Sequence, residues 1–278
     1  MALSVASLHI YPIKSLGGFS VKEARTTERG FEHDRRWMLV DDVRRFVSQR
    51  EAAAMACLHC TPTVNGFRVT DIRDNDTIDL PWRLDGGDTR RASVWSDQVD
   101  VLTAQLEVSA WFADKLGITC SLVYMPESSH RAVDQTCAQG ITSLSDGFPY
   151  LIVSQASLDD LNARIRSSSD HLAVPRSDLG MDRFRPNIVI ADGTAFQEDG
   201  WKAIMIGDTR FSLVKPCARC AIPSIDQRTG ERGKEPTRTL ATYRKRVTEN
   251  GAAKVEFGMN AMALNRGILR TGEPVRIR

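Results

Sequence analysis

The sequence has little net charge and no long hydrophobic run. Its 278 residues include 37 basic and 35 acidic side chains, which gives a formal net charge of +2. This balance predicts no nucleic-acid partner, because binding to a polyanion depends on an excess of basic charge. No stretch of about 18 apolar residues is present, and residues 1–10 lack the basic start of an export signal. These absences predict a cytoplasmic chain without a membrane segment.

The motifs of several common enzyme classes are also missing. The chain has no H-E-x-x-H, G-x-S-x-G or G-x-G-x-x-G, and Gly233-Lys234-Glu235 lacks the other residues of a P-loop. Zincin, α/β-hydrolase, Rossmann and P-loop chemistry are therefore excluded. The histidines at positions 9, 33, 59, 130 and 171 show no metal-ligand spacing, so we expect them to be structural or solvated.

The order of apolar and polar segments predicts two β-rich domains in a mainly β fold with added helices (α+β). Residues 1–125 contain short strand patterns and one helical segment at about 105–115. Residues 126–139 are polar and lack apolar periodicity, so we place the domain junction there. Residues 140–278 form the second predicted domain, in which strands again dominate.

Three local patterns predict particular turns and helices. Asn65-Gly66 between two strand patterns predicts a hairpin with a type I′ turn. Ser154 fits as the N-cap of a helix that ends by Ser167. A further helix is expected to open at Pro236 and to place three side chains on one buried face, namely Leu240, Tyr243 and Val247.

The most informative segment is Cys217-Ala218-Arg219-Cys220, which follows an apolar strand pattern at 211–214. A thiolate held at a strand end beside Arg219 is stabilised by the positive charge and keeps its sulfur accessible. Such a sulfur suits a soft metal ligand or a nucleophile. The six cysteines of a chain without an export signal are expected to be reduced thiols rather than a disulfide framework.

A second C-x-x-C, at Cys57 and Cys60, leaves a four-thiolate zinc site with Cys217 and Cys220 formally open. Side chains three residues apart on a strand point to opposite faces, so we expect Cys57 and Cys60 to lie in a half-buried strand instead.

Three further segments place basic and amide groups next to strands: residues 11–15, 33–37 and 184–187. Each basic residue taken alone is usually a solvated surface charge. Together with Arg219 they could bind a dianionic phosphate, because guanidinium groups match phosphate oxygens and a lysine adds a point charge.

Five segments in this order resemble the MOSC-domain family, and within it the mitochondrial amidoxime-reducing component and its bacterial relatives. They are Y-P-I-K-S at 11–15, D-R-R-W at 34–37, D-G-F-P-Y at 146–150, F-R-P-N at 184–187 and C-A-R-C at 217–220. The resemblance implies a β-barrel-like MOSC domain at 140–278, joined to an N-terminal β-rich domain at 1–125. It also implies a pterin molybdenum cofactor (molybdenum-molybdopterin) between them.

The same resemblance implies roles for single residues. Cys220 would be the thiolate ligand of the metal and part of the catalytic centre, and Asp146 is a hypothetical proton donor. Cys217 falls where relatives carry a cysteine of less certain role. The positions that match cofactor-binding residues of the family are Lys14, Ser15, Arg35, Asp146, Gly147, Phe148, Arg185, Asn187, Ala218 and Arg219.

The implied reaction is the two-electron reduction of small N-hydroxylated compounds, such as amidoximes, hydroxylated bases and hydroxylamines, with release of water. No iron–sulfur domain follows the MOSC segment, so electrons are expected from a separate redox protein. The alternative is a carrier of sulfur or of the molybdenum cofactor that holds a persulfide on Cys220, since MOSC domains also end the molybdenum-cofactor sulfurases.

Overall fold

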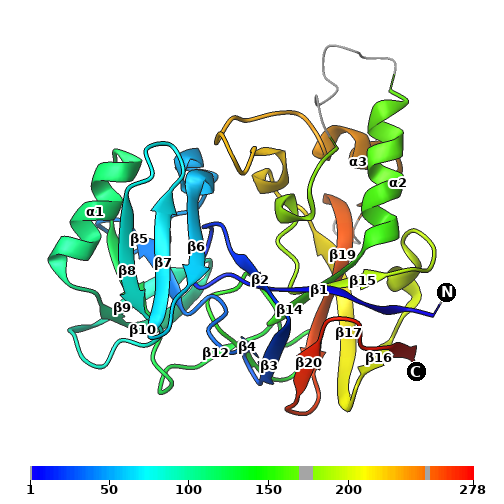
Figure 1. Cartoon of the computed structure of the whole chain (residues 1–278), viewed down its shortest axis with the longest axis horizontal. Coiled ribbons are helices and arrows are strands. Elements are labelled where there is room, and N and C mark those ends of the chain that lie inside the picture. Colours follow the sequence, from blue (N-terminus) through cyan, green and yellow to red (C-terminus); the bar gives the residue numbers. More distant parts are fainter. Residues whose placement is uncertain (1, 169–177, 248–250) are drawn as a thin grey trace.

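The computed structural model describes residues 2–168, 178–247 and 251–278. These residues form mostly strands, together with α1 (Leu106–Leu116), α2 (Gln155–Arg166) and α3 (Thr237–Tyr243). Figure 1 shows two bodies side by side, with β6 to β8 and α1 in one, and β14 to β19 with α2 and α3 in the other. The expected class, mainly β with added helices, is confirmed. His171 lies outside the described residues.

Two sheets build the body that contains α1. Their strand orders are β5-β11-β10-β9 and β6-β7-β8. Trp37 and Phe67 from the two sheets meet edge to face over Phe112 of α1 in one core, which explains why these large side chains are fully buried. The strands are β5 (Trp37–Val40), β6 (Leu58–Pro62), β7 (Gly66–Asp71), β8 (Thr77–Pro81), β9 (Thr89–Val94), β10 (Asp97–Thr103) and β11 (Ser121–Tyr124).

The other body is built on a large sheet that curves into a half barrel. Its order is β2-β1-β15-β14-β19-β17-β16-β21, with β18 paired to β19. The strands are β1 (Ser4–Ile10), β2 (Phe19–Val21), β14 (Tyr150–Ser154), β15 (Ile188–Ala191), β16 (Ala203–Ile206), β17 (Thr209–Ala218), β18 (Lys245–Val247), β19 (Ala253–Ala263) and β21 (Val275–Ile277).

Short strands complete the fold beside this sheet. One small sheet has the order β20-β3-β4 and another pairs β12 with β13. Strand β20 therefore joins a late segment of the chain to an early one. The bounds are β3 (Glu23–Thr27), β4 (Gly30–Phe31), β12 (Arg131–Ala132), β13 (Ile141–Thr142) and β20 (Ile268–Arg270).

The order of the large sheet explains the sequence of its central strands. β14 and β15 pair in parallel, and every residue of β14 is buried, as is typical of a strand that is covered on both faces. β1 pairs antiparallel to β15 with Leu8 opposite Ile188. The end of β1 therefore delivers the next residues of the chain, from Tyr11 onward, to the edge where β15 begins.

The N-cap of α2 is confirmed. The Oγ of Ser154 accepts a hydrogen bond from the backbone N–H of Ser157 at 3.2 Å. The buried carboxylate of Glu198 in turn accepts from the Ser154 N–H, the Ser154 hydroxyl and the Ser157 hydroxyl at 3.1, 2.9 and 2.8 Å. These three hydrogen bonds compensate for the water that the buried Glu198 carboxylate has lost, and they hold the start of α2 against the sheet.

Replacing Ser154 by Ala is expected to lower the free energy of unfolding by about 1–2 kcal/mol, because the cap is lost and one Glu198 oxygen loses its donor. Urea unfolding measures the change. The control is Ser167→Ala at the exposed end of the same helix, for which we expect less than about 0.5 kcal/mol. Equal effects of the two changes would contradict the role of the cap.

The predicted hairpin is present, but its predicted turn type is wrong. β6 and β7 pair antiparallel, and the Thr63 N–H donates to the Gly66 carbonyl at 2.8 Å. Neither Asn65 nor Gly66 is among the described residues with positive φ, which a type I′ turn requires. Gly66 is needed for another reason, since a Cβ there would lie 2.0 Å from the carbonyl oxygen of Leu80 on β8.

The helix that was expected to open at Pro236 is shorter than its apolar spacing predicts. α3 ends at Tyr243, and Val247 lies in β18 with 69% of its surface exposed. The backbone of β18 pairs with β19, with Lys245 opposite Val255. The ladder with β19 therefore decides the conformation of this segment, against the weak signal of a single apolar residue.

Candidate functional site

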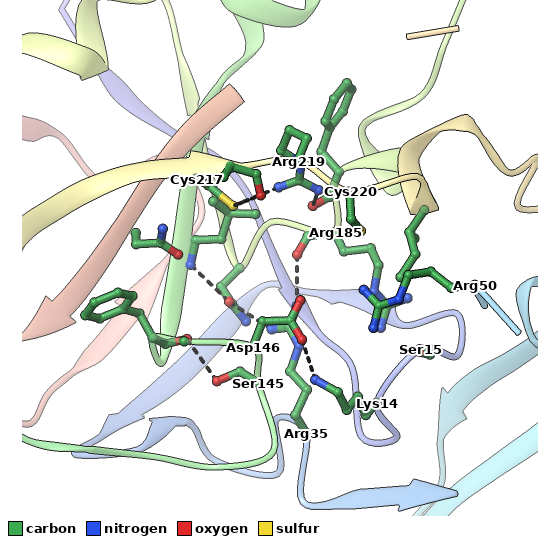
Figure 2. Close-up of a pocket in the computed structure, with 18 of the residues that line it drawn as sticks. Lys14, Ser15, Arg35, Arg50, Ser145, Asp146, Arg185, Cys217, Arg219 and Cys220 are labelled. Atoms are coloured by element: carbon green, nitrogen blue, oxygen red, sulfur yellow. Dashed lines mark hydrogen bonds and ion pairs between the residues drawn. The ribbon is translucent and has the colours of Figure 1, made fainter. Parts of the chain in front are cut away.

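One pocket brings together all the positions proposed from the sequence as cofactor or metal contacts. They come from the loop after β1, the turn before β5, the segment before β14, the segment before β15 and the end of β17. Figure 2 shows Cys217, Arg219 and Cys220 on one side of the pocket and Lys14 and Asp146 on the other. The positions are Lys14, Ser15, Arg35, Asp146, Gly147, Phe148, Arg185, Asn187, Ala218, Arg219 and Cys220.

The backbone is strained at several of these positions. Ser15, Arg35 and Arg185 have φ values of 70°, 47° and 56°, in the left-handed region that costs a residue with a side chain about 1–2 kcal/mol. Such strain persists only where surrounding contacts hold it, and it gathers at functional sites.

Lys14 and Asp146 form the ion pair across the pocket from the cysteines. The Lys14 ammonium donates to Asp146 Oδ1 at 2.5 Å and to the Leu144 carbonyl at 2.9 Å. Burial lowers the pKa of Lys14, against the attraction of Asp146. Partial desolvation acts to raise the pKa of Asp146, but the charge and hydrogen bond of Lys14 outweigh it and hold that pKa well below its usual range. Asp146 is therefore ionised at neutral pH, with 64% of its side chain exposed.

Arg35 is fixed by a buried network beneath the pocket. Its Nη1 donates to Asp34 Oδ2 at 2.6 Å and to Asn187 Oδ1 at 2.9 Å, and its Nη2 donates to the Arg185 carbonyl at 2.9 Å. The other oxygen of Asp34 accepts from the Tyr11 N–H at 2.9 Å. The network ties the loop after β1, the turn before β5 and the start of β15 to one another, so that their pocket residues keep a common geometry.

The guanidinium groups of Arg185 and Arg219 each have a buried nitrogen without a hydrogen-bond partner among the described residues. Arg185 lies over the Tyr11 ring at 4.3 Å and donates from Nη1 to the Leu16 carbonyl, while its buried Nη2 has no partner among the described residues. Burial and the nearby charge of Arg35 lower the pKa of Arg185 to about 10. The buried Nε of Arg219 also lacks a partner in the described part of the chain. Buried N–H donors that lack an acceptor are suited to bind an anionic group.

The two pocket cysteines differ from the expectation in one respect. β17 extends through Cys217, so that Cys217 lies in the strand and Cys220 just beyond its end. The guanidinium of Arg219 donates to the Cys217 sulfur at 3.1 Å and to the Phe184 carbonyl at 2.9 Å. The thiol that lies beside Arg219 is thus that of Cys217. Cys220 is half-buried and faces the pocket.

The hypothesis of a four-thiolate zinc site is wrong. Cys57 ends a short 3-10 helix and Cys60 lies in β6, and both are buried rather than half-buried. Burial raises the pKa of Cys60 to about 12, so this sulfur is a neutral thiol. Within the described ranges, no three His, Cys, Asp or Glu side chains are grouped closely enough to hold a metal.

Sequence reasoning missed part of the pocket wall. Arg50 faces the pocket from the segment after β5, beside the ring of Phe46 at 5.6 Å. Ser145 and Asn260 contribute polar groups from the segment before β14 and from β19. No spacing signal marks these positions, because each is brought to the pocket by a different element.

Two family models match the chain in sequence. The model of the MOSC N-terminal beta barrel domain matches residues 2–119, and that of the MOSC domain matches residues 139–276. The residues that line the pocket lie within these matches, and the chain belongs to the MOSC-domain family. The resemblance drawn from the five short segments is confirmed.

Relatives of two kinds are similar to this chain. It is 30% identical to mitochondrial amidoxime-reducing component 1 of Mus musculus, across 98% of this chain and 81% of that protein. It is 28% identical to a molybdenum cofactor sulfurase of Solanum lycopersicum, across 92% of this chain and 32% of that protein. The human sulfurase is 29% identical, across 93% and 30%. The chain thus spans about a third of the length of the sulfurases it matches.

No helix among the described residues is long and apolar enough to cross a membrane.

Proposed function

We propose that this protein is a molybdenum-cofactor-dependent reductase of small N-hydroxylated compounds. The observation that carries the proposal is the single pocket in which the half-buried Cys220 thiol faces a set of cationic side chains. The amidoxime-reducing relatives, of which the chain covers most of the length, support the reductase class. The electron donor would be a separate redox protein, and the proposed location is the cytoplasm.

The residues present fit a pterin molybdenum cofactor. A thiolate is a strong donor to a soft transition metal, which suits Cys220 as the protein ligand. Lys14, Arg35 and Arg185 supply positive charge for the phosphate of the pterin, and the unpaired nitrogens of Arg185 and Arg219 supply donors without a partner elsewhere in the described chain. Ser15, Gly147, Phe148, Asn187 and Ala218 line the same pocket, which supports their proposed contacts with the cofactor.

When bound, the cofactor supplies the two electrons that, with two protons, convert an N–OH group to N–H and release its oxygen as water. The chain provides position and proton transfer. Its cationic side chains would orient the anionic cofactor, and Asp146 lies on the pocket wall with 64% of its side chain exposed. Because Asp146 is ionised, it can donate a proton only after taking one up from the solvent that reaches this exposed side chain. We therefore assign it the role of a relay that Lys14 holds in place.

Replacing Asp146 by Asn is expected to lower kcat about 100-fold while the molybdenum content is unchanged, since the amide keeps the shape but cannot carry a proton. The low pKa of Asp146 means that its carboxylate form dominates from pH 6 to 9, so titration of Asp146 should not change the rate of the wild type in this range. Steady-state rates from pH 6 to 9 measure this. Asp134→Asn, in an ion pair with Lys215, serves as control. Unaltered turnover in Asp146→Asn would dismiss the relay.

The sulfurase relatives support a second candidate, a carrier with a persulfide on Cys220. The two functions are separated by elemental analysis and mass spectrometry of the purified protein, followed by an assay of amidoxime reduction with a reduced viologen dye. Bound molybdenum with reductase activity supports the first. A persulfide on Cys220 with neither molybdenum nor reductase activity supports the second and overturns the first.

A further inference from the structure

Trp95 has a backbone conformation that a bulky side chain rarely adopts. It forms, with Ser96, the two-residue turn between β9 and β10, in which Val94 pairs with Asp97. Its φ is 57°, at the first position of a tight hairpin turn, where glycine is the common residue. Glycine would avoid the unfavourable contact of Cβ with the backbone. The chain therefore places its largest side chain where the backbone least favours one.

Burial does not account for this choice. Trp95 is 51% exposed, although a buried tryptophan would contribute more to the core. The strain is therefore not offset by a hydrophobic interior. An outlier of this kind points to a functional use of the side chain.

All the described polar and aromatic contacts of Trp95 are to residues of the pocket wall. The Arg50 guanidinium lies 4.4 Å from its ring centre, and Phe46 meets it edge to face at 5.1 Å. Its indole N–H donates to Asp146 Oδ1 at 3.3 Å, the same oxygen that Lys14 binds. Phe46, Arg50 and Asp146 line the pocket, and the half-exposed Trp95 contacts all three. Figure 2 shows Arg50 at the side of the pocket next to Lys14 and Asp146. Trp95 thus stands at the rim, fixed by three contacts.

We infer that Trp95 is a stacking platform for a planar aromatic ring carried by the substrate, and that it sets a preference for aryl over alkyl N-hydroxylated compounds. This inference rests on the proposed reductase function. The exposed indole offers a flat π surface, and an offset-stacked ring gains attraction beyond the area that it buries. The N–H bond to Asp146 fixes the indole next to the proposed proton relay, so a ring bound there carries its N–OH group toward the pocket. An alkyl substrate lacks the flat surface and gains little from the platform.

The test compares benzamidoxime with acetamidoxime in the molybdenum-loaded enzyme and in three variants, Trp95→Gly, Trp95→Ala and Trp95→Phe. We expect Trp95→Gly to lower kcat/KM for benzamidoxime about 10-fold, mainly through KM, and to change that for acetamidoxime less than about 2-fold. Trp95→Phe should restore most of the preference, because phenylalanine keeps a flat ring. Equal losses on both substrates, or no loss on either, would overturn the platform.

A second measurement separates a platform from a structural role. Because glycine adopts a positive φ without strain, Trp95→Gly should unfold at the same temperature as the wild type or at a higher one. Trp95→Ala should not unfold at a higher temperature than the wild type, because alanine keeps the strain. A stabilised variant that has lost affinity for the aryl substrate is not explained by damage to the fold. A clear loss of stability in Trp95→Gly would show that the side chain supports the fold, and would overturn the inference.

A third measurement does not depend on turnover. Calorimetric titration with benzamidine, the product of benzamidoxime reduction, should give weaker binding in Trp95→Gly than in the wild type, with acetamidine as the alkyl control. If the protein reduces no N-hydroxylated compound but this difference persists, the proposed function fails and the platform stands. If reduction occurs and the aryl and alkyl ligands bind alike in the wild type and in the variant, the platform fails and the function stands.

Discussion

Cys220→Ala is expected to purify with less than about a tenth of the molybdenum of the wild type and to lose its reductase activity, because the variant lacks the only protein sulfur proposed to bind the metal. Cys220 faces the pocket beyond the end of β17. No other described cysteine besides Cys217 lies on the wall of the pocket. Metal analysis of protein purified from cells supplied with molybdate measures the content.

The matched control is Cys217→Ala, in the same segment and on the same wall. The Cys217 sulfur accepts a hydrogen bond from Arg219 at 3.1 Å, so its removal frees a guanidinium without removing the proposed ligand. We expect this variant to keep at least about half of its molybdenum, since the proposed thiolate ligand Cys220 remains. Full molybdenum in Cys220→Ala, or its loss only in Cys217→Ala, would contradict the assignment of the ligand.

Asp34→Ala is expected to lower the free energy of unfolding by about 3–5 kcal/mol, because it leaves the buried guanidinium of Arg35 without its countercharge. The Asp34 side chain is fully buried, and Arg35 donates to it at 2.6 Å. The Tyr11 N–H loses its acceptor in the same change. Since Arg35 also holds Asn187 and the Arg185 carbonyl, cofactor content should fall together with stability. Urea unfolding and metal analysis measure the two effects.

An exposed ion pair on β7 and β8 provides the control. Arg68 binds Asp79 through two hydrogen bonds at 2.7 and 2.8 Å, and about half of each side chain is exposed. Asp79→Ala should cost about 0–1 kcal/mol, because water solvates the charge that remains. A comparable loss of unfolding free energy in the two variants would show that the stabilisation by the Asp34–Arg35 ion pair does not depend on its burial.

The strands were predictable where apolar residues form a short uninterrupted run. The apolar runs at 37–40 and 188–191 form β5 and β15, and the strand pattern at 211–214 lies within β17. The prediction failed where pairing with another strand decides the conformation, as at Val247, which pairs with Ala253 at the start of β19. The predicted turn type also failed at Gly66, where glycine makes room for the Leu80 carbonyl of β8 and does not supply a positive φ. The apolar spacing within each segment does not show with which strand it pairs.

The pocket was predictable from short motifs because each of these places a functional group next to a strand end, and the strand ends meet. The domain limits of 1–125 and 140–278 and the roles of the pocket residues stay predictions. Arg50 and Trp95 were missed because neither lies in such a motif. Their use emerges only when the turn between β9 and β10 is seen beside Phe46 and Asp146.

The place of β1 has a consequence for how the protein is made. The ribosome releases residues 4–10 long before their neighbour β15, at Ile188–Ala191. Until β15 is made, β1 can pair with β2 on one side, but its other edge stays open. Closure of such a distant contact is slow compared with local pairing. The loop that carries Lys14 and Ser15 therefore reaches its final place late, and the pocket is among the last parts of the molecule to be assembled.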